Sequence, residues 1–252
     1  MTWDQLALMF PWLNWTTVLV YARVQASLLI LPGLGERILP VRIRVAAAMA
    51  VTPLLAGAVA RVPMPGTQQE IMWQVAAQMV IGLAGGALLR LLTMAIDIAS
   101  TAIAATASLS QIVGVPNEAA PHPIGNLLHL GGLAILMALG LPVMLLRLMA
   151  DGLAIWPPGA WPDVATLAPD AVQIVVYSFG LAMLLAAPFT LGGLLFQALS
   201  GVINRVMPAL PVVFIGSPAA ILLALIALGL LAPMLVGLWV DAVFDFTLPG
   251  SP

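Results

Sequence analysis

The chain has 252 residues, of which 62% are hydrophobic and 7% charged, with a formal net charge of −2. This composition excludes an ordinary soluble domain and is typical of a polytopic membrane protein. The charge is too small and too dispersed to indicate a nucleic-acid partner. Cysteine is absent, which excludes disulfides, thiol catalysis and cysteine metal sites. We therefore expect an all-α membrane-type protein forming one integral domain over residues 1–252.

Apolar windows along the chain predict six helical segments. They cover residues 6–31, 45–60, 71–96, 127–148, 171–203 and 206–240. Residues 101–115 are small and polar and do not form a clear span. The three prolines that follow exclude a regular helix there. A second loop is expected over residues 151–170, which contain several prolines and aspartates.

The last two segments are unusually long for membrane helices. Residues 171–240 contain a single charged residue, Arg205, and each arm exceeds the roughly 20 residues that cross a bilayer. These arms must tilt, kink or rise out of the membrane. Five prolines offer break points: Pro188, Pro208, Pro211, Pro218 and Pro233. We expect Asn204 and Arg205 to form the turn between the arms, because Asn tolerates left-handed backbone.

A few polar residues inside apolar segments could carry chemistry. Arg23 lies in the first segment, where it is either a functional charge or pairs with a carboxylate or a carbonyl in the protein interior. Asp97 lies near the end of the third segment, without a second carboxylate at helical spacing to support a proton relay. His122 and His129 could share a helix face, but Pro123 interrupts that continuity and no acidic residue lies at ligand spacing. We therefore expect no metal site.

The motifs of common enzyme classes are missing from the sequence. There is no HExxH, GxSxG or phosphate-binding loop, and no pair of carboxylates in a plausible pocket. The glycines of residues 82–86 lie in apolar helix context, where small residues permit close helix packing rather than phosphate binding. The sequence thus predicts a non-enzymatic protein without a cofactor.

Two motifs are specific enough to compare with a known family. Residues 31–44 carry Gly35-Glu36-Arg37 after an apolar segment, then a proline and a basic helix start. Residues 201–218 carry a second set of residues: Asn204, Arg205, Pro208, Leu210, Phe214, Gly216 and Pro218. Both motifs resemble signatures of the FliR/SctT family of type III export-gate proteins, and the order of apolar segments is similar along nearly the whole chain. Retention of the two charged turns favours the flagellar FliR branch over the virulence-secretion SctT branch.

The resemblance implies a core subunit of the flagellar protein export gate, in the bacterial inner membrane at the flagellar basal body. In that family the subunit joins FliP and FliQ subunits in a closed helical hetero-oligomer, which admits unfolded export substrates. FlhB-like and FlhA-like export proteins are further expected partners, besides the lipid bilayer. Residues 1–170 would pack like a FliP subunit and residues 171–252 like a FliQ subunit.

The resemblance and the irregular composition together suggest two groups of site residues. Residues 107–123 are expected to form a non-helical loop that plugs the channel, since irregular backbone at membrane depth must be buried in protein or line a cavity. The plug residues are Ser110, Gln111, Ile112, Val113, Gly114, Val115, Pro116, Asn117 and Glu118. The expected assembly residues are Arg23, Gly35, Glu36, Arg37, Asn204, Arg205, Pro208, Phe214, Gly216 and Pro218.

Other readings of the plug and of the whole chain stay open at this level. Residues 107–123 could instead be an ordinary connector. An SctT homologue is the nearest alternative for the chain. A small secondary transporter with broken helices is a third, although no internal repeat is visible and only Arg23 suits a midplane ionisable site.

Overall fold

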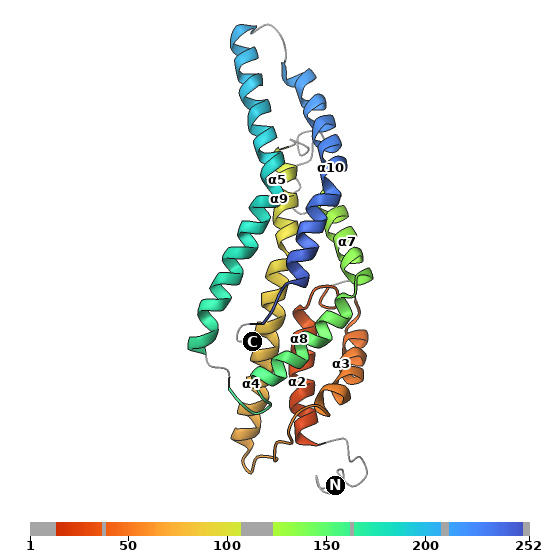
Figure 1. The fold of residues 1–252 in the computed structure, drawn as a ribbon, viewed down its shortest axis with the longest axis vertical. Coiled ribbons are helices and arrows are strands. Elements are labelled where there is room, and N and C mark those ends of the chain that lie inside the picture. Colours follow the sequence, from red (N-terminus) through yellow and green to blue (C-terminus); the bar gives the residue numbers. More distant parts are fainter. Residues whose placement is uncertain (1–13, 37–38, 107–122, 162–163, 208–211, 249–252) are drawn as a thin grey trace. The chain divides into compact units, whose positions relative to one another are not determined.

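The computed structural model describes residues 14–36, 39–106, 123–161, 164–207 and 212–248. Every regular element in these ranges is an α-helix (Figure 1), which confirms the predicted all-α class. The helices are α2 (Trp15–Ile30), α3 (Val41–Ala56), α4 (Gln68–Thr93), α5 (Ala95–Thr106), α7 (Pro123–Ala138), α8 (Leu141–Ile155), α9 (Val164–Val206) and α10 (Val212–Phe244).

Several of these helices are suited to cross a membrane. Three stretches are long and apolar enough to do so: Gln68–Ile103, Ala171–Val206 and Leu222–Phe244. The bent pair of Asn126–Ala138 and Leu141–Ile155 could provide a fourth span. The predicted membrane class is therefore confirmed among the described residues.

Two predicted segments are each divided in the structure. The segment predicted at residues 71–96 becomes α4 and α5, separated by a turn at Met94. α5 continues to Thr106, into residues 101–115, for which no clear span is predicted. The segment predicted at residues 127–148 is broken at Gly140, whose φ of 102° ends the helical path. The chain bends by 73° at this break. Glycine permits such left-handed backbone at little cost, which hydrophobicity alone does not reveal.

The loop predicted at residues 151–170 is wrong at both ends. α8 continues to Ile155 and α9 begins at Val164, so the connection is much shorter. Pro157 and Pro158 fall in that connection, whereas Pro169 lies in the second turn of α9 and removes only one backbone hydrogen bond. Proline content alone therefore predicts a longer loop than the structure has.

The predicted turn at Asn204 and Arg205 is also wrong, because both residues belong to the last turn of α9. The chain continues helically to Val206, and the Met207 amide still donates to the Ile203 carbonyl at 2.8 Å. Pro188 and Pro233 do not end α9 or α10, since one missing hydrogen bond in a long apolar helix leaves the neighbouring bonds intact. Pro218 also lies within α10, while Pro208 and Pro211 fall outside the described residues.

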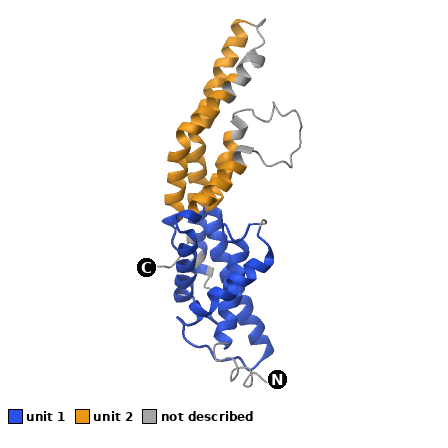
Figure 2. Ribbon diagram, turned by 90° about the vertical axis from the view of Figure 1, so that its right-hand side faces the viewer, with its two compact units in different colours: residues 1–92, 137–175, 244–252 blue, residues 93–136, 176–243 orange. Residues whose placement is uncertain are grey.

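The helices group into two compact units, coloured separately in Figure 2. Unit 1 comprises Met1–Leu92, Met137–Val175 and Phe244–Pro252, and unit 2 comprises Thr93–Leu136 and Val176–Val243. The predicted division into parts before and after residue 170 concerns likeness to partner subunits, so it stays a prediction beside these units.

Unit 1 is built on a close crossing of α2 and α4. α2 starts at Asn14, whose side chain accepts from the Thr17 amide at 2.9 Å and so caps the helix. Gly82 on α4 faces the Arg23 backbone so closely that an added Cβ would overlap the Arg23 carbonyl. A Cβ on Gly86 would lie 3.0 Å from the Ser27 carbonyl oxygen. This confirms the predicted packing role for Gly82 and Gly86.

Unit 2 has its own apolar core. The largest buried side chain in this core is Trp239 of α10, which is 2% exposed. Gly132 of α7 leaves room for it, because a Cβ there would lie 2.8 Å from Cζ3 of the indole. α9 contributes buried side chains at one- and two-turn spacing, among them Leu181, Leu185 and Phe189.

Candidate functional site

Arg23 is the most deeply buried charge among the described residues, at 4% exposed. Its guanidinium donates three hydrogen bonds: to the Gln78 side-chain oxygen at 2.8 Å, to the Gly152 carbonyl at 2.8 Å and to the Trp156 carbonyl at 2.7 Å. Of the two partners that the sequence left open, carbonyl groups are the ones found. No carboxylate of the described residues pairs with this arginine.

The position of these carbonyls explains how a cation is tolerated in the interior. Gly152 lies in the last turn of α8 and Trp156 is its C-cap residue, so both carbonyls belong to the negative end of that helix. The Gln78 amide nitrogen in turn donates to the Ala160 carbonyl at 3.5 Å. Arg23 thus ties α2 to α4 and to the end of α8, and the pocket that it lines has a volume of only about 30 Å³.

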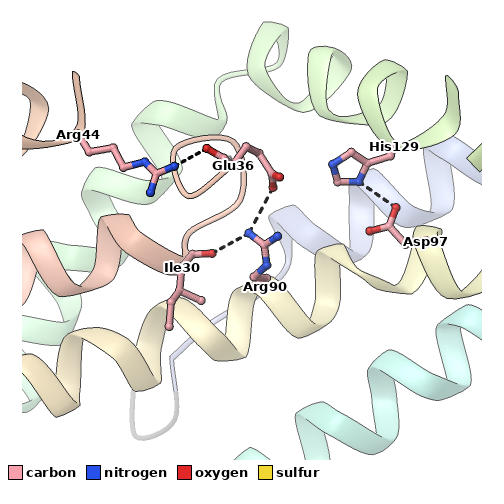
Figure 3. A network of polar contacts seen from close by, with 6 residues as sticks. All are labelled: Ile30, Glu36, Arg44, Arg90, Asp97 and His129. Atoms are coloured by element: carbon pink, nitrogen blue, oxygen red, sulfur yellow. Dashed lines mark hydrogen bonds and ion pairs between the residues drawn. The ribbon is translucent and has the colours of Figure 1, made fainter. Parts of the chain in front are cut away.

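The turn after α2 holds the second group of predicted residues (Figure 3). The Glu36 carboxylate pairs with Arg90 of α4 at 3.3 Å, and Arg90 also donates to the Ile30 carbonyl at 3.1 Å. Arg44 of α3 donates to the Glu36 backbone carbonyl. Glu36 therefore finds its partner on α4; Arg37 lies outside the described residues.

Gly35 shapes the same turn. An added Cβ would lie 2.8 Å from the carbonyl oxygens of both Leu29 and Leu31, and the Gly35 amide donates to Leu31 at 2.7 Å. Only a residue without a side chain fits this close approach to the end of α2. The charges of the turn are therefore held in place by backbone as well as by ion pairing.

Asp97 and His129 form a pair within unit 2 (Figure 3). His129 Nδ1 lies 2.8 Å from the Asp97 carboxylate, and the two side chains are 29% and 34% exposed. The pair joins α5 to α7. In the described part of the chain, no group of three or more His, Cys, Asp and Glu side chains could hold a metal ion.

The remaining predicted residues are less closely constrained. Asn204 and Arg205 are exposed at the end of α9. Phe214, Gly216 and Pro218 lie in the first turns of α10, where the structure describes the helix but not the side chains. Pro208 and the whole predicted plug, from Ser110 to Glu118, lie outside the described residues.

The structure adds partners that the sequence reasoning did not identify. Gln78 is fully buried and Arg90 is half-buried, and each is a polar side chain within the apolar helix α4. Their position in an apolar segment was a usable signal, because such side chains in membrane helices face other helices. The carbonyl partners of Arg23 could not be identified from the sequence, because every residue has a backbone carbonyl.

Comparison with known proteins places the chain in a family. Residues 14–246 match the model of the bacterial export proteins, family 1. The flagellar biosynthetic protein FliR of Caulobacter vibrioides is 31% identical over 231 residues, which cover 90% of this chain and 92% of that protein. The flagellar biosynthetic protein FliR of Aquifex aeolicus is 26% identical over 223 residues, covering 87% and 86%. With paired charges that hold helices together and a match along almost its whole length, this chain belongs to the bacterial export proteins of family 1, the FliR family.

Proposed function

We propose that this chain is a non-enzymatic core subunit of the flagellar protein export gate. It would form the channel for unfolded flagellar proteins together with FliP-like and FliQ-like partners. The observation that carries the proposal is the family match over residues 14–246, in a chain with three to four candidate membrane spans. FlhB-like and FlhA-like export proteins are proposed as further neighbours.

The apolar surface of the long helices supports a function within an assembly. Only 33% of the apolar window in Ala171–Val206 is buried within the chain, and only 11% of that in Leu222–Phe244. Large side chains such as Leu195, Leu199 and Leu230 are more than half exposed. Lipid or partner helices must cover them, because water cannot solvate so much apolar surface without a large free-energy cost.

Residues 110–118 are proposed to plug the channel at rest. The support is sequence composition together with the described helices α5 and α7, which lead into and out of this part of the chain. The Asp97–His129 pair joins these two helices and so limits how far their ends can separate.

Deletion of Ser110–Ala119 tests the plug directly. The complex of this chain with its partner subunits should still assemble, but ion conductance through it in planar bilayers should rise because the obstruction is gone. Deletion of Pro63–Gly66, in the connection between α3 and α4, is the control for shortening a loop. Unchanged conductance of an intact complex would refute the plug.

The turn around Gly35 and Glu36 is proposed as an assembly interface, together with the predicted residues of α9 and α10. Glu36 is paired inside its own chain, so an alanine variant would first loosen the turn and then its contacts with partners. The function itself is tested by co-purification: the tagged chain should recover FliP-like and FliQ-like chains. Recovery of a solitary chain stabilised by a small solute would instead indicate a transporter.

A further inference from the structure

A groove of about 840 Å³ lies in unit 1, between α8 and the residues that follow α10. No role proposed above uses it. Most of its lining residues are apolar, among them Val143, Met144 and Ile155 of α8 and Phe244, Phe246 and Leu248 at and after the end of α10. The volume is within the range of about 300–1,000 Å³ usual for small-ligand sites. Apolar walls of this kind favour hydrocarbon over a polar metabolite.

Two opposite charges border the groove on one helix face. Arg147 and Asp151 both line it, both are exposed, and they are four residues apart on α8. At this spacing their Cβ atoms lie about 5–6 Å apart, on the same side of the helix. Neither side chain makes a hydrogen bond or ion pair with another described residue. Among the described residues, a cation and an anion thus border the groove without a polar partner.

We propose that this groove binds one phospholipid with a phosphoethanolamine headgroup. One of the two acyl chains lies along the apolar walls, the guanidinium of Arg147 holds the phosphate, and the carboxylate of Asp151 accepts hydrogen bonds from the primary ammonium. A guanidinium offers paired donors that suit a phosphate, and an ammonium offers three donors to a carboxylate. The two charges on α8 therefore match the two charges of the headgroup: Arg147 suits the phosphate and Asp151 suits the ammonium.

The same charges discriminate against other membrane lipids. An anionic headgroup would gain from Arg147 but would be repelled by Asp151 at short range. A choline headgroup carries no N–H donor, so it cannot hydrogen-bond to the carboxylate. The chain has three candidate membrane spans, and α8 belongs to the bent pair that could provide a fourth, so lipid is a ligand that this groove can meet.

The test uses the full chain in its complex with partner subunits, reconstituted in phosphatidylcholine nanodiscs with added phosphatidylethanolamine or phosphatidylglycerol. Native mass spectrometry counts the lipids that remain on the complex. We expect phosphatidylethanolamine to be retained about tenfold more strongly than the other two, the effect of one charge-assisted hydrogen bond. Equal retention of the three lipids would overturn the proposal.

Matched variants locate the site. Asp151→Asn should abolish the preference for ethanolamine over choline but keep phospholipid binding, and Arg147→Gln should reduce retention of every phospholipid. Asp241→Asn and Arg61→Gln remove exposed charges that do not line the groove, so they should retain lipid as the wild type does. If the controls lose as much lipid as the groove variants, binding is not at this groove.

A photo-cross-linking residue in place of Val143 gives a second measurement that does not depend on removing a charge. Val143 is 55% exposed and lines the groove. A cross-link to phosphatidylethanolamine supports the proposal, whereas cross-links to protein alone, with none to lipid, contradict it. Because the readout is bound lipid rather than export, it is independent of whether the complex acts as an export gate.

Discussion

Arg23 shows how a single buried charge can join three helices. Its charge is placed against the carbonyl end of α8, where two peptide oxygens and the Gln78 amide supply the bonds that water would otherwise supply. Two of these partners are more than a hundred residues away in sequence, with separations of 129 and 133. Arg23 therefore fixes how α2, α4 and α8 meet.

Replacement of this arginine by methionine is the corresponding prediction. Arg23→Met keeps the length of the side chain but leaves the Trp156 carbonyl and the Gln78 oxygen without a buried donor. We expect the free energy of unfolding to fall by about 2–5 kcal/mol. Thermal unfolding in detergent, followed by tryptophan fluorescence, measures the change. Arg61→Met, at an exposed position, should have little effect; equal stability of the two variants would refute the role of Arg23.

At the scale of elements, close packing of the helices depends on the positions of glycines, which have no side chain. Gly82 and Gly86 lie one turn apart on α4 and let the backbone of α2 approach at Arg23 and Ser27. The Ser27 hydroxyl, 3.1 Å from the Gly82 carbonyl, lies at the same crossing. Between helices without water, such close contact supplies dispersion energy that a wider crossing would lose.

Gly82→Ala should therefore separate α2 from α4. The added methyl group would overlap the Arg23 carbonyl, which is backbone and cannot rotate away. We expect a loss of about 1–3 kcal/mol or more in stability. Gly85→Ala is the matched control on the same helix, because its Cβ would only touch Leu248 at an ordinary 3.7 Å. Similar unfolding temperatures for the two variants would show that the crossing is looser than described.

In unit 2, replacement of Gly132 on α7 by alanine should also be destabilising. An alanine there would place its Cβ 2.8 Å from the buried Trp239 ring, so the indole or the helix must move, at a cost of about 1–3 kcal/mol. The neighbouring Gly131 has nothing within 4 Å of such a Cβ. Gly131→Ala should be neutral or slightly stabilising, since alanine favours the helix. Tryptophan fluorescence and the thermal midpoint, measured on both variants, distinguish them.

At the scale of the whole molecule, the decisive fact is how much apolar surface the chain leaves for its surroundings. The end of α9 is exposed, and Arg205 there is the single charged residue in the sequence between residues 171 and 240. Its position in the last turn of α9 suits the helix dipole, which favours a cation at a C-terminus. A specific contact with a partner carboxylate would also require the paired hydrogen bonds of the guanidinium.

Arg205→Lys separates the two functions of this charge. Lysine keeps the positive charge but cannot form the paired hydrogen bonds of a guanidinium. If Arg205 contacts a partner carboxylate, the yield of complex in co-purification should fall several-fold. Full assembly and normal export with lysine would leave charge alone as its contribution, acting on membrane orientation. Arg61→Lys, at another exposed arginine, is the control.

The sequence by itself determined the membrane class and the family of this protein. Both rest on local properties, namely long apolar segments and two short motifs, that are visible without knowing which helices meet. It also indicated that Arg23 would find an internal partner and that the glycines near residue 82 serve packing.

Only the tertiary structure showed which side chains pair with one another and where the helices break. The pairing of Glu36 with Arg90, of Asp97 with His129 and of Arg23 with the end of α8 joins residues far apart in the chain. The division at Gly140 and the continuation of α9 through Arg205 were likewise not evident. The hydrophobicity of a segment indicates that it is buried but does not identify the helices that it packs against. The crossing of helices depends on how the side chains of several helices fit together.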